Sequence, residues 1–461
     1  MCRHLRVIAL IAISTSLSPL TVSWAQPAAG LTAPTQNPTV RLVEDPRTQR
    51  LLRVTARLDV RGRILAPVGT DRVVPLPLTA TANLGWEERR LRPAGEFHGS
   101  LRAARYLLAA VSSVRVDRQT TENNLRMTRR YISSQGTPSG IRHVALDGPL
   151  SGSELELLDL PADPLALLGA MPPGQVPHDH SWKPGTWTLP LITGLDAVTR
   201  GTLQGQVVQV ATTSATIRLT GTAEGAAGGA KSKVSFDATI EFDHKQGFLT
   251  TAKVRLEERR QAGPVSPGLD IVATVTINRT LATSSPRLTF KTASRSEPQP
   301  TASDLSIELA APAGHRLLHD RQWHLFHQAP GTTILRRLEH GTLVSQCNLS
   351  EAPTLAPGRI TPRETFLADV KRALGPRLRD IQSITSLSPE RGGRGWRAVA
   401  TGIDHGLPMT WIYYLKATPA GKQISLVFSI ESSRLKSWGQ RDIEMVTRLS
   451  SSSPRPKTAR R

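Results

Sequence analysis

Apolar and polar residues alternate along most of the first two thirds of the chain. One row runs from Leu52 to Val60 and a second from Leu76 to Trp86. A period of two puts one face of a strand in a core and the other in water, which is typical of antiparallel sheets. The rows predict one large curved antiparallel sheet, a half-barrel, within residues 40–293. Its further strands are expected at 103–117, 123–133, 199–211, 214–223, 232–243, 248–260 and 269–280.

A short helical insertion at residues 151–170 interrupts these strands. Ser151 and Glu154 have the spacing of a capping box, in which each side chain bonds an otherwise unpaired amide of the first helical turn. Asp163 followed by Pro164 favours a second short helix with proline at its first position. The leucines that follow each start are expected to pack on the inner face of the curved sheet.

A second domain is predicted over residues 304–450, after a linker at 294–303 that is rich in serine and proline. Alternating rows continue in this domain and again indicate antiparallel pairing. Its strands are expected at 304–311, 322–327, 332–338, 342–349, 395–403, 408–417 and 422–431.

The clearest helix of the chain lies between these strands. Thr361 is expected to cap it, Pro362 to open it and Gly375 to end it, while Glu364 completes a capping box. A final helix is expected at 437–448. The order of strands and helices favours an α+β sandwich with both helices on one side of the sheet.

The order from Leu305 to Leu449 resembles the PsbP-like α/β/α sandwich. The matching pieces are the strand at Trp323, the helix Thr361–Leu374, and the paired strands Leu407–Leu415 and Lys422–Ile430. The resemblance covers about a third of the chain. It implies binding more than chemistry, because known members of that family are mostly non-enzymatic accessory or assembly factors.

Two further resemblances concern larger parts of the chain. The first domain is similar in outline to LolA-like lipoprotein-carrier half-barrels. The whole chain also resembles secreted proteins of large-genome bacteria, a likeness that implies no function. The expected fold class is therefore α+β and β-rich, with a half-barrel domain followed by a smaller PsbP-like sandwich.

The N-terminal segment 1–25 has the layout of a secretory signal peptide. A short basic start precedes an apolar run, Val7–Val22, and a small-x-small sequence ends at Ala25. Serines and a proline interrupt the run, so it is a poor membrane-spanning helix, and no later stretch is long enough to span a bilayer. We expect an exported bacterial protein, periplasmic or extracellular, with residues 26–39 as a flexible leader.

The charge is strongly positive. Lys and Arg number 58 against 37 Asp and Glu, a formal net charge of +21. Such a field favours anionic partners such as envelope polymers. Opposite charges interleave, as in Trp86–Arg90, and only the tail 451–461 is purely basic and has the composition of a disordered segment. Aromatic residues make up 4% and do not interleave with basic stretches, so no nucleic acid is expected.

One loop holds the strongest candidates for ligand contact. His178 and His180 are two residues apart, so on an extended segment both side chains share a face, and Trp182 and Trp187 follow closely. A third metal ligand is not identifiable there. The loop is interpreted either as a ligand-contacting segment or as two tryptophans that plug one end of the sheet.

Four histidines fall between His315 and His327. His324 lies five residues after His319 and three before His327, both odd numbers, so on one straight strand it points to the face opposite to each of them. Convergence on a metal requires a turn between them. Cys347 is the one cysteine beyond the signal peptide, which excludes an intramolecular disulfide and favours a buried apolar role.

Signatures of catalysis are missing from the sequence. It contains no G-x-S-x-G, H-E-x-x-H, phosphate-binding loop or dinucleotide fingerprint. We therefore expect no catalytic residue, cofactor or resident metal. The favoured interpretation is an exported, non-catalytic binding or accessory protein of the cell envelope. A lipid or peptide ligand would occupy the half-barrel, and a protein partner would bind the C-terminal domain.

Two other hypotheses stay open. One is a metal-dependent hydrolase that uses His178 and His180 or the cluster His315–His327. The other is a structural surface protein that its positive charge holds to anionic polymers.

Overall fold

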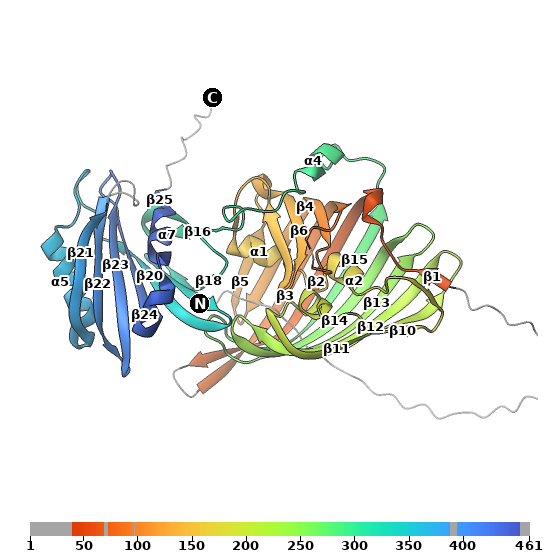
Figure 1. Ribbon diagram of the computed structural model, residues 1–461, viewed down its shortest axis with the longest axis horizontal. Helices are drawn as coiled ribbons and strands as arrows, with labels where there is room; N and C mark the ends of the chain where they lie inside the picture. Colours follow the sequence, from red (N-terminus) through yellow and green to blue (C-terminus); the bar gives the residue numbers. More distant parts are fainter. Residues whose placement is uncertain (1–38, 69–71, 96, 388–393, 452–461) are drawn as a thin grey trace, which may run out of the picture.

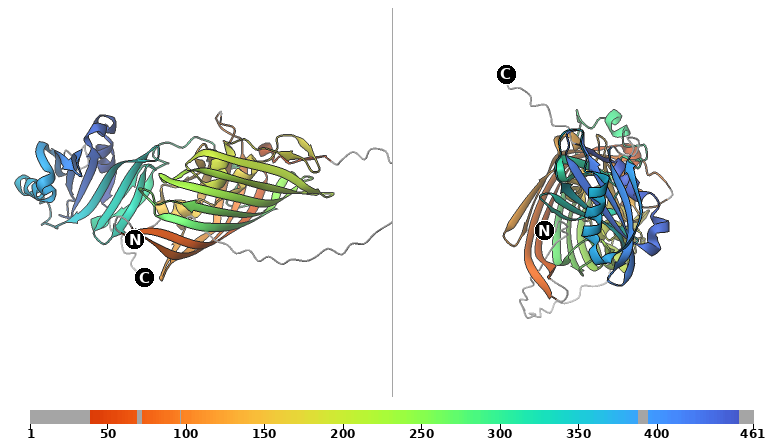
Figure 2. Two further views of the ribbon diagram at one scale, coloured as in Figure 1. Left: turned by 90° about the horizontal axis from the view of Figure 1, so that it is seen from below. Right: turned by 90° about the vertical axis from the view of Figure 1, so that its left-hand side faces the viewer.

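The computed structural model describes residues 39–68, 72–95, 97–387 and 394–451. The expected signal peptide, all but the last residue of the leader and the tail from residue 452 onward lie outside these ranges. Within them the chain is a β-rich α+β protein, as predicted, with two large antiparallel sheets in two halves that lie side by side along the long axis (Figures 1 and 2). None of the described helices is long and apolar enough to cross a membrane.

The N-terminal half is built on a twelve-stranded antiparallel sheet. Its order is β10-β11-β12-β13-β14-β15-β2-β3-β4-β6-β7, with β5 paired to β4 beside this path. The strands are β2 (Leu51–Val68), β3 (Arg72–Leu91), β4 (Arg102–Val116), β5 (Gln119–Asn124), β6 (Tyr131–Thr137), β7 (Gly140–Ala145), β10 (Ser181–Trp182), β11 (Ala197–Val210), β12 (Ser214–Ala227), β13 (Ala230–Asp243), β14 (Phe248–Arg260) and β15 (Gly268–Leu281).

The predicted rows therefore appear as paired strands, with one exception. The row at 123–133 is wrong as a single strand, because β5 ends at Asn124 and a short 3-10 turn, η2 (Met127–Arg129), separates it from β6. The pairing that joins the two ends of this half is between β2 and β15, where Leu58 lies opposite Val275.

The insertion connects opposite edges of the sheet. The chain leaves β7 at one edge and enters β11 near the other, so residues 146–196 must cross the inner face. The crossing segment carries three helices, α1 (Gly152–Leu158), α2 (Pro164–Gly169) and α3 (Thr188–Thr193). Helix α3, which the sequence did not predict, contacts both β7 and β11. The insertion is thus longer than 151–170.

The predicted starts of α1 and α2 are confirmed. The Glu154 amide donates to Ser151 Oγ at 3.2 Å, and the Ser151 amide donates to Glu154 Oε2 at 2.8 Å, which completes the capping box. Asp163 Oδ1 accepts from the Leu165 amide at 2.9 Å, and Pro164 occupies the first position of α2. Helices this short do not hold by themselves in water, so packing and capping must keep them folded.

The inner face of the curved sheet is apolar. Along β13, every second residue from Val234 to Phe242 is buried, while Glu241 points outward. These side chains form one core with Ala166 and Leu167 of the insertion, both 0% exposed. The insertion therefore covers the apolar face that the alternation creates.

The C-terminal half holds a seven-stranded antiparallel sheet of order β18-β19-β20-β24-β23-β22-β21. Its strands are β18 (Trp323–Ala329), β19 (Thr332–Glu339), β20 (Thr342–Ala352), β21 (Leu378–Leu387), β22 (Arg394–Asp404), β23 (Leu407–Ala417) and β24 (Gln423–Glu431). Its helices are α5 (Arg363–Leu374), α6 (Leu435–Trp438) and α7 (Arg441–Thr447). A further short helix, α4 (Phe290–Ser294), precedes this half.

Helices cover both faces of this smaller sheet, so the prediction of both helices on one side is wrong. Residues alternate along β23: Trp411 and Tyr413 pack with α5, whereas Ile412 and Tyr414 share a second cluster with α7. A strand of this length with apolar residues on both faces needs a cover on each.

Three details of the C-terminal prediction also need correction. Helix α5 starts at Arg363 without a side-chain cap, because Thr361 Oγ1 donates instead to Gln423 Oε1 at 3.1 Å. The final helix is broken into α6 and α7 at Gly439, whose φ of 61° ends a helix at little cost. Strands β17 (His315–His319) and β21 were not predicted.

Two small sheets tie distant segments together. Strand β1 (Thr39–Arg41) pairs with β9 (Gln175–Pro177) in the insertion. The other sheet has the order β25-β17-β16-β8, with β25 (Leu449–Ser451), β16 (Ile307–Ala311) and β8 (Leu150–Ser151). Strand β8 belongs to the N-terminal half and pairs in parallel with β16, so this sheet joins the two halves.

Candidate functional site

The loop predicted to contact a ligand lies at the end of the insertion. His178 Nδ1 lies 3.0 Å from Asp179 Oδ2, and both side chains are partly exposed. The His180 ring lies nearly parallel to the Trp182 ring, with centroids 6.3 Å apart. Trp182 Nε1 donates to the Ala170 carbonyl at 2.9 Å and so attaches β10 to the end of α2.

The two tryptophans of this loop have packing roles. Trp182 lies over Gly205 of the neighbouring strand, where a Cβ atom would come within 2.3 Å of its ring. Trp187 packs edge-on against Phe97, with ring centroids 5.8 Å apart. Both belong to the margin of the main core, which agrees with the interpretation that they plug one end of the sheet.

The histidines between His315 and His327 are divided between two sheets. His315 and His319 lie on β17, and His324 and His327 lie on β18 of the seven-stranded sheet. Burial lowers the pKa of both His315 and His319, whose Nδ1 atoms lie within hydrogen-bond distance of backbone carbonyls. In the described ranges no group of three or more His, Cys, Asp or Glu is placed to hold a metal ion.

Cys347 is buried in β20, and its thiol is free. Burial, followed by the nearby negative charge of Asp442, raises the pKa of this thiol well above its ordinary value. A thiol kept protonated is a poor nucleophile, which agrees with the predicted packing role.

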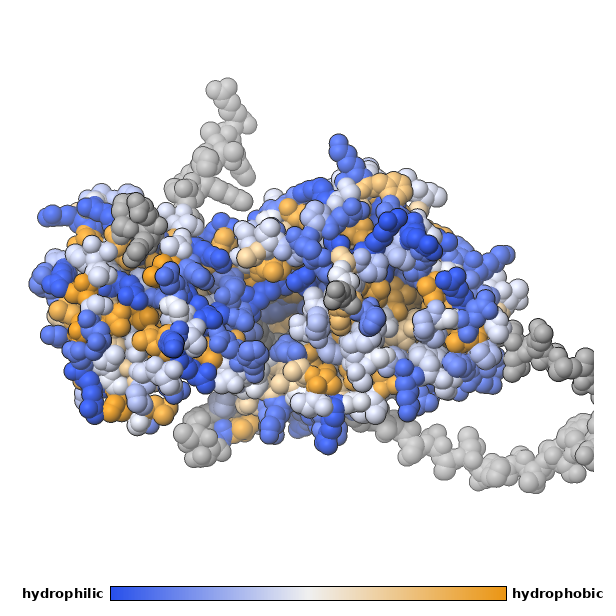
Figure 3. All heavy atoms as spheres, viewed as in Figure 1, coloured by the Kyte–Doolittle hydropathy of each residue, from blue (hydrophilic) through white to orange (hydrophobic). Residues whose placement is uncertain are grey.

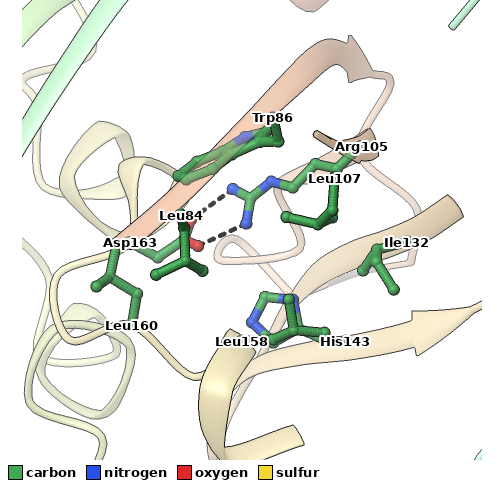
Figure 4. A pocket seen from close by; sticks show the side chains of 9 residues that line it. All are labelled: Leu84, Trp86, Arg105, Leu107, Ile132, His143, Leu158, Leu160 and Asp163. Carbon is green, nitrogen blue, oxygen red and sulfur yellow. Dashed lines mark hydrogen bonds and ion pairs between the residues drawn. The ribbon is translucent and has the colours of Figure 1, made fainter. Parts of the chain in front are cut away.

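The inner face of the half-barrel also holds a buried cluster of charged residues, which was not predicted from the sequence. Arg105 on β4 donates from Nη1 and Nη2 to the two carboxylate oxygens of Asp163 at 2.6 and 2.7 Å. Its Nε donates to Glu88 Oε2 at 2.8 Å. Because Asp163 also caps α2, this guanidinium joins the insertion to the sheet (Figure 4).

Glu88 is the centre of this cluster. Trp86 Nε1 donates to its Oε2 at 3.1 Å, and Arg279 Nη2 donates to its Oε1 at 3.1 Å. Burial alone would raise the pKa of this carboxyl, but the charges of Arg105, Arg279 and Arg90 outweigh it and lower the pKa to about 2. Glu88 therefore stays ionised in the fold.

Arg279 extends the cluster to the N-terminal segment. It is fully buried and donates to both carboxylate oxygens of Glu44, at 3.2 and 2.9 Å. A buried ion pair stabilises little in comparison with a well-packed apolar pair, but the loss of one partner is costly. The cluster therefore links β3, β4 and β15 to the segments of Glu44 and Asp163 that lie over them.

A small cavity of about 10 Å³ lies beside Arg105 and is lined by the insertion and by β3, β4, β6 and β7 (Figure 4). This is about the room that one water needs. His143 faces it: its Nδ1 lies 2.9 Å from Ser134 Oγ, and its buried Nε2 has no hydrogen-bond partner in the described part of the chain. Burial, and then the positive charge of Arg105, lowers the pKa of His143 to about 3.

The sequence carried a weak signal for this cluster. Opposite charges interleave in the stretch Trp86–Arg90, and Glu87, Glu88, Arg89 and Arg90 are all buried. A β-bulge between Gly85 and Trp86 breaks the alternation just before this stretch. The available clue was the run of two acidic and two basic residues directly after the alternating row that ends at Trp86.

Neither a family model nor a curated protein matches this chain. Solved structures show slight likenesses. A protein from Bacteroides thetaiotaomicron is 11% identical, with 32% of this chain and 48% of that chain covered and a TM-score of 0.24. A lipovitellin structure on lipid–protein interactions is 8% identical, with 52% and 26% covered and a TM-score of 0.27. The chain thus spans less than half of either structure.

A third likeness covers more of both chains but is weaker. The OmpF structure of Salmonella typhi, in complex with daunomycin, is 7% identical, with 84% of this chain and 98% of that chain covered and a TM-score of 0.14. Likenesses this slight carry no argument about the site. The PsbP-like and LolA-like resemblances stay predictions.

Proposed function

We propose that this protein is an exported, non-catalytic binding protein of the cell envelope. It would take an apolar ligand, a lipid or an apolar peptide, on the inner face of the half-barrel beneath the insertion. The observation that carries the proposal is the cover of this face. Three helices of seven, six and six residues lie over a twelve-stranded apolar sheet, where a second sheet would lie in a sandwich.

A removable cover agrees with the way the insertion is attached. The insertion shares the apolar core of the sheet. Its polar and backbone contacts with the sheet are few, and they include Arg105 with Asp163 and the two residue pairs of β10 with β11. Movement of the insertion away from the inner face would break the two residue pairs of β10 with β11 and leave the other ladders of the large sheet intact.

The surface of the N-terminal half supports an entry point for the ligand. Figure 3 shows a recess in the N-terminal half, with apolar residues at its depth and polar residues around it. In the same orientation, Figure 1 places this recess between α2 and β1. Strand β1 pairs with β9 of the insertion, so displacement of the insertion would widen this recess.

Binding without chemistry is also the interpretation that the candidate residues favour. The loop of His178, His180, Trp182 and Trp187 packs against the end of α2 and the sheet edge. The clusters required by a metal-dependent hydrolase are not brought together in the described ranges. The positive charge remains available for attachment to anionic polymers in addition to ligand binding.

A disulfide lock tests the movement of the insertion. Ser181 on β10 lies directly opposite Gln206 on β11, a pairing that places Cβ atoms about 4.5–5.5 Å apart. We would make Ser181→Cys with Gln206→Cys and measure binding of the neutral fluorescent probe N-phenyl-1-naphthylamine. We expect the oxidised variant to bind the probe more weakly than the same variant after reduction, which serves as the matched control.

Two results would contradict the proposal. Wild-type protein that neither binds the probe nor carries a lipid or peptide in native mass spectrometry would exclude an apolar binding protein. Equal probe binding by the oxidised and reduced variants would exclude entry beneath the insertion.

A further inference from the structure

A cleft of about 320 Å³ lies where the two edges of the half-barrel approach each other and the C-terminal half begins. Its walls come from the β6–β7 turn, the loop between α1 and α2, helix α3 and the turn that precedes β18. We call it the seam cleft. Two arginines line it from opposite halves of the molecule: Arg142 on β7 and Arg321 between β17 and β18.

Neither arginine has a carboxylate partner. Arg142 Nη2 donates to Gln135 Oε1 at 3.0 Å. Arg321 donates from Nε to the Leu305 carbonyl at 3.1 Å and from Nη2 to the His143 carbonyl at 2.6 Å. The ion pairs of residues 39–68, 72–95, 97–387 and 394–451 include neither of them. A guanidinium has five N–H groups, so four remain on Arg142 and three on Arg321.

The surroundings of Arg142 and Arg321 make it costly in free energy to keep both groups charged. Burial lowers the pKa of Arg142, and burial followed by the positive charge of Arg142 lowers the pKa of Arg321 to about 10. Both groups keep their charge at neutral pH, so two like charges are held close together in a half-buried cleft. Arg105 and Arg279 are paired with carboxylates, whereas the buried Arg89 and Arg102 donate to backbone carbonyls, as Arg321 does.

The other polar groups of the cleft have partners within the protein. The Thr193 hydroxyl donates to the Leu189 carbonyl at 2.7 Å, and Asp196 Oδ2 accepts from the Gly228 amide at 2.6 Å. The unused hydrogen-bonding capacity of Arg142 and Arg321 is therefore that of donors with positive charge. An anion with several oxygen acceptors matches it, because planar guanidinium groups bind such oxygens in pairs.

We propose that the seam cleft is a binding site for an oxyanion, a phosphate or carboxylate group, which Arg142 and Arg321 hold between them. The site needs no apolar ligand beneath the insertion and stands independently of the proposed function. Because Arg321 belongs to the C-terminal half and Arg142 to the sheet edge, the anion would also stabilise the junction between the halves.

The first experiment is isothermal titration of the full-length protein with inorganic phosphate, and separately with acetate, at ionic strength matched with sodium chloride. We would compare wild-type protein with Arg142→Gln, Arg321→Gln and the double variant. The control is Arg379→Gln, which removes the same charge from the exposed edge strand β21. We expect saturable binding that is about tenfold weaker or more in each cleft variant and unchanged in the control.

A second set of titrations distinguishes the sources of the anion. Dodecanoate presents the same carboxylate as acetate at the head of an apolar chain. Binding of phosphate or acetate that the cleft variants weaken supports a free anion as the ligand. Binding of dodecanoate alone, weakened in the same variants, supports the head group of an amphiphile.

The variants must also be shown to fold, because Arg321 bonds two carbonyls. Circular dichroism and unfolding by urea check this, and Arg142→Lys gives a milder change that keeps the charge but loses the paired geometry. No saturable binding of phosphate, acetate or dodecanoate to the wild type would overturn the proposal. Binding that is equally strong in the folded cleft variants and in the control would overturn it as well.

Discussion

The two halves of the molecule cover their sheets in different ways. The seven-stranded sheet has α5, with twelve residues, on one face and an aromatic cluster of Trp323, Phe428 and Trp438 on the other. The twelve-stranded sheet has only short helices over its inner face, and they share its apolar core. A buried ion pair between Arg105 and Asp163 also attaches α2. Apolar packing therefore holds both covers, but the second is held by buried charge as well.

This difference teaches that two covers with apolar packing can be fixed in different ways. Dispersed apolar contacts stabilise both covers. A directed bond such as that of Arg105 with Asp163 also fixes where the cover of the N-terminal half sits. Charge in the N-terminal half and aromatic area in the C-terminal half should therefore dominate the response to mutation.

The largest expected effect is the loss of the central cation. Arg105→Met leaves Asp163 buried without its cation and leaves Glu88 with Arg279 as its remaining ion pair, which should lower the free energy of unfolding by about 3–5 kcal/mol. Unfolding in urea measures it. The control is Arg63→Met, which breaks an exposed pair with Asp270 and should cost less than about 1 kcal/mol. Equal losses in the two variants would contradict the role given to the buried cluster.

A truncation in the other half sharpens the comparison. Leu374 is 2% exposed and packs from α5 onto the smaller sheet. Leu374→Ala should lower the free energy of unfolding by about 2–5 kcal/mol through lost contacts and a cavity. Binding of an apolar probe by the N-terminal half should not change in the same variant. A change in probe binding would show that the two covers are coupled.

Acid should weaken the N-terminal half through His143. Its pKa is about 3 in the fold, against an ordinary 6.5, so at pH 5 the unfolded chain binds a proton that the folded chain does not. Stability should therefore fall as the pH drops below 6.5, by about 2 kcal/mol by pH 5.

The measurement is urea unfolding at pH 7 and pH 5. Arg105, Asp163 and Arg321 are the charged groups that act on His143. His143→Gln should reduce the fall but not abolish it, since burial also lowers the pKa of His315 and His319. Glu88 titrates in the fold at about pH 2 and has little effect in this window. An undiminished fall in the variant would exclude His143 as its source.

The smallest effect concerns a helix cap. Ser151→Ala removes the acceptor for the Glu154 amide and should cost about 1 kcal/mol. Arg126 holds the same Glu154 carboxylate with Nε and Nη2 at 2.7 and 2.6 Å, so α1 should stay folded. Circular dichroism and urea unfolding measure both effects. A loss as large as that of Arg105→Met would mean that capping, not the buried cluster, holds the insertion.

Much of the fold could be predicted from local patterns in the sequence. Alternation identified the long strands, and the signals at Ser151 and Asp163 located α1 and α2, because these features depend on neighbours within a few residues. Strand β21 was missed because it is an edge strand in which no residue is buried, so it lacks the alternation. Helix α3 was missed because proline and glycine surround it.

The candidate site was much less predictable. Arg105 meets Asp163 across 58 residues, and Arg279 meets Glu88 across 191, so nothing in the local sequence relates them. Charged residues are usually exposed, so the four adjacent charged residues Glu87–Arg90 are typical of a strand end in water. For Trp182 and Trp187 the sequence leaves ligand contact and a packing role open, and the contacts with Gly205 and Phe97 are packing contacts.

The pairing of β2 with β15 has a consequence for the order of folding. During synthesis, β2 and β3 emerge early and can form their hairpin at once, but the other edge of β2 has no neighbour until residues 268–281 appear. The pairing of β15 with β2 closes a long loop and is therefore slow. Until then the unpaired edge of β2 can pair with strands of other chains. A nascent chain that stops before Gly268 should therefore expose the unpaired edge of β2. The half-barrel is protected from aggregation through this edge only after its last strand has been made.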